Sequence, residues 1–352
     1  MFGGSKYSVP RRCTVVTRLH TSDGLVSEVY NGDNRHGGSE ICEIVQDELA
    51  PLVIGEDAMA VERLWQKMFP IASLIRDRKL VMGAIACVDT ALWDVVGKAL
   101  GTRVSTLFGG YRDDLPIISI GGYYEDGITL DHYRREMEAL KSRGMAGCKF
   151  KVGGLTPEED LERVKAARDG AGPDFLIAID ANCGWPVEDA RRFARLVEPY
   201  DILWFEEPCQ WYDDAVGNAE VRRASTIPVT AGQSEISSHG VKRLIAAGGI
   251  DYCNLDASDS GGPTEWRRAA GLCAVHGVKM AHHEEAQIAL HMLAGVPHGS
   301  YVECFADPER DPIWDKMYAN RPKVENGKIA VPEAPGFGIE LDWDMVNKYR
   351  ID

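Results

Sequence analysis

The chain has 352 residues, of which 45% are hydrophobic and 26% are charged, as is typical of a globular protein with a sizeable core. Its 39 Lys and Arg stand against 54 Asp and Glu, which gives a formal net charge of −15. This balance, with basic groups no larger than pairs such as Arg11 and Arg12, argues against a nucleic-acid partner. The length predicts roughly two domains.

The lengths of the apolar runs and the arrangement of the cysteines indicate in which cellular compartment the protein is located. The most apolar stretch, residues 80–100, is interrupted by Asp89, Asp94 and Lys98, so no run reaches the ~18 residues of a membrane span, and no signal peptide is recognisable. Nine cysteines are scattered without a C-x-x-C pair, which argues against a disulfide framework or a zinc knuckle. We expect a cytoplasmic protein with no membrane partner.

The N-terminal part reads as an α+β domain. Residues 13–18 and 25–30 predict paired strands around a turn at 21–24, and helical patterns follow from residue 39 to about residue 100. Strand and turn residues return at the end of the chain. We therefore predict a capping domain over residues 1–110, completed by about 320–352.

Residues 111–319 predict a barrel domain. Short apolar β-type segments alternate there with amphipathic helical stretches, and Thr156 before Pro157 has the form of a helix N-cap. The predicted strands are 116–120, 147–152, 175–180, 202–207, 227–232, 252–256, 278–283 and 300–305. Eight such units without a glycine-rich dinucleotide fingerprint predict an α/β fold of the (β/α)8, TIM-like type rather than an open doubly wound sheet.

Polar side chains end most of these strands, where barrels of this type place their active sites. They are Lys149, Lys151, Asp180, Asn182, Glu206, Glu207, Glu235, Asp256, His282, His283, Glu284, Glu285 and Glu303. Alternate residues of a strand share one face, so Lys149 and Lys151 are expected to project together, as are Asp180 and Asn182.

An oxygen-only metal site is one expectation from this pattern. Asp180, Glu206 and Glu235 come from consecutive strands and would suit Mg²⁺ better than zinc. A helical H-E-x-x-H zinc motif is not formed, since Gln287 stands where the second histidine is needed.

The chain resembles the mandelate racemase subgroup of the enolase superfamily over nearly its whole length. The residues that carry the resemblance are Gly83 to Ala86, Asp89 to Asp94, Lys149, Lys151, Asp180, Asn182, Trp204 to Pro208, Asp256, His283 and Glu303. The resemblance implies a modified (β/α)7β barrel with an α+β capping domain. It also selects Glu206 over Glu207 and His283 over His282, between which the residues alone do not choose.

The resemblance implies a role for each site residue. Asp180, Glu206 and Glu235 would bind Mg²⁺, Lys151 would be a general base, and His283, bonded to Asp256, a second acid/base. Glu303 would donate a hydrogen bond to the substrate carboxylate. Lys149 would lower the pKa of Lys151, because a neighbouring like charge disfavours protonation.

These roles suit abstraction of the proton next to a carboxylate. We expect a lyase that dehydrates an acid sugar, an aldonate or aldarate, to a 2-keto-3-deoxy acid. A racemase or epimerase of a 2-hydroxy acid is the alternative, and a non-catalytic binding barrel a minor one.

Substrate contacts and assembly complete the expectations. A small anionic carboxylate is the expected partner, and Asn182, Arg11, Arg12, Arg35 and His36 are candidates to bind it. The resemblance implies a homo-oligomer, a dimer or an octamer.

Overall fold

The computed structural model describes residues 12–32, 37–74, 76–308 and 310–351. It begins with an antiparallel hairpin of β1 (Val15–His20) and β2 (Val26–Asn31), in which Val15 lies opposite Asn31. The turn is closed by the amide of Thr21, which donates to the carbonyl of Leu25 over 3.0 Å. The predicted hairpin is confirmed.

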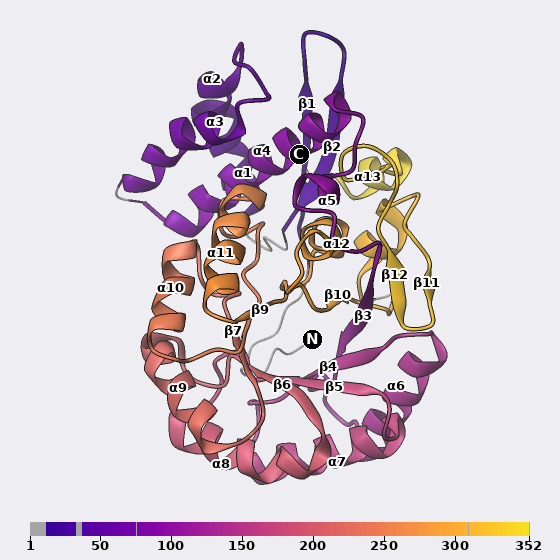
Figure 1. Cartoon of the computed structure of the whole chain (residues 1–352). Helices are drawn as coiled ribbons and strands as arrows, with labels where there is room; N and C mark the ends of the chain where they lie inside the picture. The colour runs from indigo at the N-terminus through magenta and orange to yellow at the C-terminus, as the bar shows by residue number, and fades with distance from the viewer. Residues whose placement is uncertain (1–11, 33–36, 75, 309, 352) are drawn as a thin grey trace.

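Helices follow the hairpin, with α4 at their centre (Figure 1). They are α1 (Gly38–Glu43), the π-helix η1 (Ile44–Leu49), α2 (Ala50–Val53), α3 (Val61–Met68), the 3₁₀ turn η2 (Phe69–Ser73), α4 (Arg78–Ala99) and α5 (Val104–Leu107). By length and hydropathy α4 could cross a membrane, but 94% of its apolar window is buried inside the protein. Such burial is what a core helix shows, and α4 packs against both hairpin strands.

Eight parallel strands form a closed barrel in the described part of the chain. They are β3 (Asp114–Gly121), β4 (Gly147–Lys151), β5 (Leu176–Asp180), β6 (Ile202–Glu206), β7 (Val229–Ala231), β8 (Tyr252–Cys253), β9 (Lys279–Met280) and β10 (Val302–Cys304). Neighbours pair in chain order from β3 to β9, a bridge joins Met280 to Gly299, and β10 pairs with β3.

A helix joins each strand to the next. These helices are α6 (Leu130–Ser142), α7 (Pro157–Ala171), α8 (Val187–Val197), α9 (Asp214–Ala224), α10 (Ser238–Ala246), α11 (Pro263–Val275) and α12 (Ala286–Gly295), with short 3₁₀ turns η3 (Glu198–Tyr200) and η4 (Trp211–Asp213). The predicted (β/α)7β barrel is confirmed. Thr156 is the N-cap of α7, as predicted, and forms a capping box with Glu159.

The end of the chain contacts both halves of the molecule. It contains η5 (Ile313–Met317), β11 (Val324–Glu325), β12 (Lys328–Ala330) and α13 (Trp343–Tyr349). β12 pairs antiparallel with β3, whereas the indole of Trp343 donates to Glu28 of β2. The carbonyl of Gly336 accepts from the amide of Val104 over 2.9 Å.

Buried polar contacts hold the N-terminal helices and hairpin on the barrel. Asn31 of β2 donates to Ser258, which follows β8, over 3.0 Å. Asp89 of α4 accepts 2.8 Å bonds from both the amide and the hydroxyl of Thr264 in α11. These contacts lie beyond the carboxyl ends of the strands, so they fix the N-terminal elements over the edge where the polar strand ends meet.

Candidate active site

Two buried lysines of β4 face the acids of the neighbouring strands. Lys151 is in register with Asp180, and Asp180 with Glu206. The Nζ of Lys151 donates to Asp180 Oδ2 over 2.5 Å and to Asn182 Oδ1 over 2.9 Å. These four side chains therefore project from three adjacent strands into the barrel mouth, as the alternation of the strands predicts.

Lys149 lies one position deeper and joins three carboxylates. Its Nζ is 2.9 Å from Glu206 Oε1, 2.6 Å from Glu303 Oε2 and 3.8 Å from Asp180 Oδ2. All four side chains are almost completely buried. A positive charge thus sits between Asp180 and Glu206, which shows that the two carboxylates converge on one point.

Charge pairing sets the protonation of this cluster. Burial alone would lower the pKa of Lys151, but the adjacent Asp180 carboxylate outweighs it and raises that pKa above its ordinary value. Burial would raise the pKa of Asp180, but Lys151 and Lys149 together lower it. The predicted lowering of the Lys151 pKa by Lys149 is present, yet it is weaker than the effect of Asp180.

His283 and Asp256 form a hydrogen-bonded pair in the loops that follow β9 and β8. Nδ1 of His283 is 2.9 Å from Asp256 Oδ2, and Asp256 Oδ1 accepts from the amide of Ser258 over 2.8 Å. Burial would lower the pKa of His283, but Glu284 and Asp256 outweigh it and raise that pKa to about 9. The imidazolium is therefore the favoured form at neutral pH.

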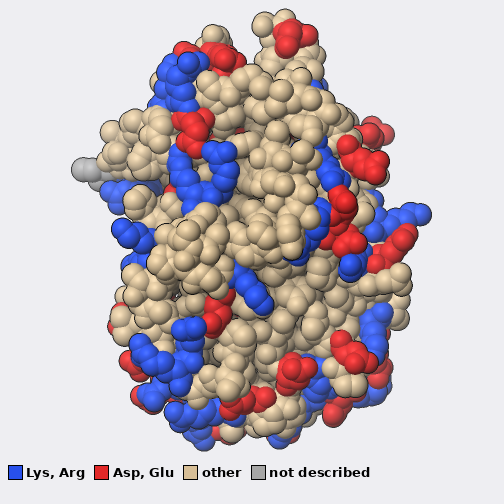
Figure 2. All heavy atoms as spheres, viewed as in Figure 1, with Lys and Arg blue, Asp and Glu red and all other residues tan. Residues whose placement is uncertain are grey.

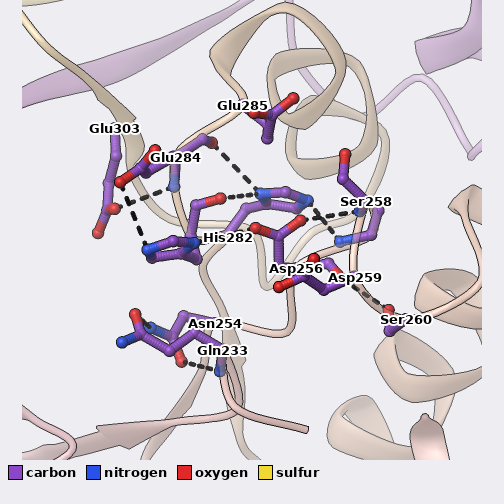
Figure 3. A network of polar contacts seen from close by, with 12 residues as sticks. Gln233, Asn254, Asp256, Ser258, Asp259, Ser260, His282, Glu284, Glu285 and Glu303 are labelled. Carbon is purple, nitrogen blue, oxygen red and sulfur yellow. Dashed lines mark hydrogen bonds and ion pairs between the residues drawn. The ribbon is translucent and has the colours of Figure 1, made fainter. Parts of the chain in front are cut away.

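His282 has a different environment. Its Nε2 accepts the amide of Ala257 over 3.0 Å, and its Nδ1 lies 2.8 Å from the carbonyl of His283 (Figure 3). The ring is fully buried, and burial lowers its pKa. His282 therefore holds two loops together, and His283 is the histidine that pairs with Asp256.

Glu284 is a site residue that the sequence reasoning did not assign. Its Oε1 lies 3.6 Å from His283 Nε2, and its backbone amide donates to Glu303 Oε2 over 3.1 Å. Arg12 binds its Oε2 at 2.7 Å from the N-terminal side of the chain. Glu284 and Glu285 both have positive φ, +49° and +51°, a conformation uncommon away from glycine and often found at functional sites.

The two carboxylate oxygens of Glu303 differ in their hydrogen bonds. Its Oε2 accepts from Lys149 and Glu284, whereas its buried Oε1 has no hydrogen-bond partner among the described residues. Glu303 also lines a small pocket that opens to solvent. Arg12 and Tyr30 line that pocket from the N-terminal elements, and Asp311 lines it from the chain beyond β10.

The structure does not bring Glu235 to Asp180 and Glu206. The guanidinium of Arg243 in α10 holds its carboxylate and also binds Asp214 in α9. Within the described ranges, no group of three or more His, Cys, Asp or Glu side chains is arranged to hold a metal ion. The loop after β7 carries Glu235 outward to the helices, which sequence spacing could not reveal.

The structure describes two of the five predicted substrate-binding residues, Arg12 and Asn182. Arg12 is engaged by Glu284, with its guanidinium 4.6 Å from the ring centre of Phe305. Asn182 accepts from Lys151. Arg11, Arg35 and His36 lie outside the described residues.

A closed (β/α)7β barrel with paired lysines, converging carboxylates and a His–Asp pair at its carboxyl-terminal mouth defines an enolase-superfamily barrel enzyme. Residues 5–109 match the N-terminal domain of the mandelate racemase / muconate lactonizing enzyme family, and residues 132–345 match the enolase C-terminal domain-like family. The chain belongs to the mandelate racemase / muconate lactonizing enzyme family.

Two similar proteins are named for reactions of acid sugars. The chain is 30% identical over 341 residues to 3,6-anhydro-alpha-L-galactonate cycloisomerase of Streptomyces coelicolor, covering 96% of this chain and 91% of the relative. It is 29% identical over 343 residues to arabinonate dehydratase of Saccharolobus solfataricus, covering 96% and 90%.

A solved structure shows the same fold with a metal. It is a mandelate racemase/muconate lactonizing enzyme from a marine actinobacterium in complex with magnesium. The two chains are 46% identical, superpose with a TM-score of 0.93, and are each covered to 96%.

Proposed function

We propose that this protein is a Mg²⁺-dependent acid-sugar dehydratase that converts an aldonate or aldarate to a 2-keto-3-deoxy acid. The observation that carries the proposal is the placement of two proton-transfer groups, Lys151 as the last residue of β4 and His283 in the loop after β9. These strands are not neighbours in either direction around the barrel, so the two groups approach its mouth from separate sides. The similarity to arabinonate dehydratase supports the same reaction class.

The acids around Lys149 fit a magnesium ion. Asp180 and Glu206 offer hard oxygen ligands that converge on one point, where the Lys149 ammonium now lies. When bound, Mg²⁺ would stabilise the negative charge that develops on the substrate carboxylate as the neighbouring proton leaves. The magnesium in the similar structure supports this cofactor.

Lys151 is the proposed base. It must be neutral to accept the proton from C2, and the Asp180 carboxylate is what keeps it charged in the structure. Any cation that competes for Asp180 would weaken this pairing and lower the pKa of Lys151. Asn182, a neutral acceptor 2.9 Å from Nζ, would keep the amine in place as the pairing weakens.

His283 is the proposed acid. Its imidazolium, favoured by Asp256 and Glu284, would give a proton to the 3-hydroxyl as the C3–O bond breaks. The electron pair of the C2–H bond becomes the C2–C3 double bond of an enol, water leaves, and the enol takes a solvent proton at C3 to become the keto acid. Glu303 lines the pocket, and its Oε1 has no partner within the described ranges, so it would hold the substrate carboxylate when protonated.

Ring opening is a second candidate, which the similarity to the 3,6-anhydro-galactonate cycloisomerase favours. The same base and acid would then expel a ring oxygen at C3 instead of a hydroxyl, and no water would be lost. Racemisation of a 2-hydroxy acid would also use both groups, but it would return the proton to C2.

A screen of diastereomeric acid sugars and their anhydro forms with Mg²⁺, analysed by mass spectrometry and for keto acids, separates these reactions. Dehydration gives a keto acid lighter by one water, whereas ring opening gives a keto acid of unchanged mass. A product with inverted C2 and no keto acid would reject both in favour of racemisation. His283→Asn is expected to abolish either elimination.

A further inference from the structure

We propose that the side-chain oxygen of Gln233, and not a carboxylate of Glu235, completes the cation site of Asp180 and Glu206. The site would then contain two carboxylates and one neutral amide. This inference rests on the proposed function only in that the site binds a divalent cation. It concerns which residues bind the cation and makes no claim about the reaction that follows.

The side chain of Glu235 contacts α10, one of the helices outside the barrel. Arg243 binds its carboxylate and holds Asp214 with its other nitrogen, so one guanidinium joins two acids. The carboxylate also lies against Gly240 in α10, where a Cβ would come within 1.8 Å of Glu235 Oε2. Moving Glu235 into the barrel mouth would leave Arg243 with one partner fewer and would require the loop to be rebuilt.

The register of β7 leads to Gln233. Thr230 pairs with Glu206 and with Tyr252, so it shares their inward face. The next inward position is Gly232, which has no side chain and a φ of +142°. Gln233 therefore carries the first side chain that β7 can offer at the barrel mouth.

The contacts of Gln233 are with groups that face this mouth. Its backbone amide donates to Asn254 Oδ1 over 3.2 Å. Asn254 is two residues beyond Tyr252, which packs with Trp204 inside the barrel, so Asn254 lies on the inward face of β8. Figure 3 shows the Gln233 and Asn254 side chains next to one another, with Asp256 further along the same chain segment.

A neighbouring carboxylate fixes the direction of the Gln233 amide. Its Nε2 donates to Glu207 Oε2 over 3.0 Å, and Glu207 is itself held by the amide of Ser234 and the thiol of Cys183. Because a carboxylate only accepts, the amide nitrogen must lie on the Glu207 side and Oε1 on the opposite side. Glu207 is adjacent to Glu206 in the chain, so this anchor is next to the proposed ligand.

The Gln233 oxygen is the less engaged of the two amide oxygens. In the part of the chain that the structure describes, its Oε1 receives a single long contact, 3.4 Å, from Asn254 Nδ2. The Asn254 oxygen already accepts the Gln233 backbone amide. A carbonyl oxygen is a good ligand for a hard cation. The Gln233 oxygen could bind a cation by giving up one long hydrogen bond, whereas the Asn254 oxygen would have to give up its bond to a backbone amide.

An amide in this place changes the charge of the site. Two carboxylates carry one negative charge fewer than three, so the cation is bound less strongly, and its remaining positive charge is more available to an anionic substrate. The expected consequence is a cation affinity that rises when Gln233 is made acidic.

Calorimetric titration of Mg²⁺ into the full-length protein without substrate tests the inference, with Mn²⁺ and electron paramagnetic resonance as a second readout. Gln233→Leu keeps the size but removes the oxygen, and is expected to weaken binding about tenfold or more. Gln233→Glu is expected to tighten binding about tenfold, because it adds a charge. Glu235→Gln, the matched control, should change binding less than about twofold.

The inference is overturned if Gln233→Glu binds no more tightly than the parent, or if Glu235→Gln weakens binding as strongly as expected for Gln233→Leu. Gln233→Glu keeps the test valid even if Gln233→Leu fails to fold. A parent that binds no Mg²⁺ would overturn it as well. Turnover is measured separately, so a parent that binds Mg²⁺ through Gln233 but dehydrates no acid sugar would reject the proposed function alone.

Discussion

At the scale of single residues, the proton on His283 is held between two carboxylates. Asp256 bonds its Nδ1, and Glu284 lies 3.6 Å from its Nε2. Both favour the imidazolium and raise the pKa of His283 to about 9, above the ordinary 6.5. For a histidine whose folded pKa is raised, the stabilisation is complete below pH 6.5 and is lost as pH rises through about 9.

Glu284→Gln should therefore shift the basic limb of the pH–rate profile to lower pH. The amide keeps the shape of the side chain but removes the charge that Glu284 contributes to the His283 pKa. The pH dependence of kcat/KM for the parent and the variant checks this. Glu285→Gln is the control and should leave the limb in place, since the Glu285 carboxylate accepts from the side-chain amide of Gln287 instead. An unmoved limb in Glu284→Gln would contradict the role of Glu284.

Strand-end residues were the predictable part of the site. Lys151, Asp180 and Glu206 are inward because side chains alternate along a strand, and the pairing of His283 with Asp256 follows from adjacent strand ends. Glu235 was not predictable, because a loop turns it toward Arg243. Nor was the contact of Glu284 with Arg12, which lie 272 positions apart in the chain.

At the scale of elements, the predicted strands were found in the correct order, but those near the site are shorter than expected. Residues 278–283 predicted one strand, whereas β9 contains only Lys279–Met280. The ring of His282 accepts a backbone amide from the neighbouring loop, and His283 turns to Asp256. His282 and His283 are therefore outside the strand, and their side chains contact the loop that follows β8. A local hydrophobic pattern does not reveal contacts of this kind.

The N-cap at the start of α7 is a local feature that was predicted from the sequence, and its contribution to stability can be measured. Thr156 Oγ1 accepts from the amide of Glu159, and the Glu159 carboxylate accepts from the amide of Thr156. Thr156→Ala is expected to lower the free energy of unfolding by about 1 kcal/mol, measured by urea denaturation. Thr129→Ala is the matched control, since Thr129 is the N-cap of α6 without a side-chain cap bond. Equal losses in the two variants would contradict the contribution of the capping box.

At the scale of the whole molecule, the chain carries a formal net charge of −15. Figure 2 shows acidic and basic side chains interspersed on the face in view. Inside the barrel the acids are instead grouped around Lys149 and Lys151. The acids therefore include two kinds, those exposed on the face in view and those buried in the barrel at the proposed cation site.

Cation binding at the site should stabilise the entire fold. A ligand that binds only the folded state at about 100 times its Kd adds about 2.7 kcal/mol. Thermal denaturation with Mg²⁺ is thus expected to give a higher Tm than denaturation with EDTA, and Asp180→Asn should remove most of the difference. An equal shift in that variant would mean that Mg²⁺ binds to surface acids instead.

The predicted homo-oligomer concerns the same scale. Sedimentation velocity of the purified chain would test it, with a dimer or an octamer as the expected species. A monomer at micromolar concentration would contradict that expectation without affecting the site.

Incubation of the parent and of Lys151→Ala with Mg²⁺ and a panel of aldonates and aldarates in D₂O, followed by proton NMR, tests the proposed chemistry most directly. For at least one acid sugar, the parent is predicted to give a 2-keto-3-deoxy acid with deuterium at C3, and Lys151→Ala to lose this activity by about 10²-fold or more. A parent that neither forms a keto acid nor exchanges the C2 proton of any acid sugar would contradict the proposal, as would an equally active Lys151→Ala.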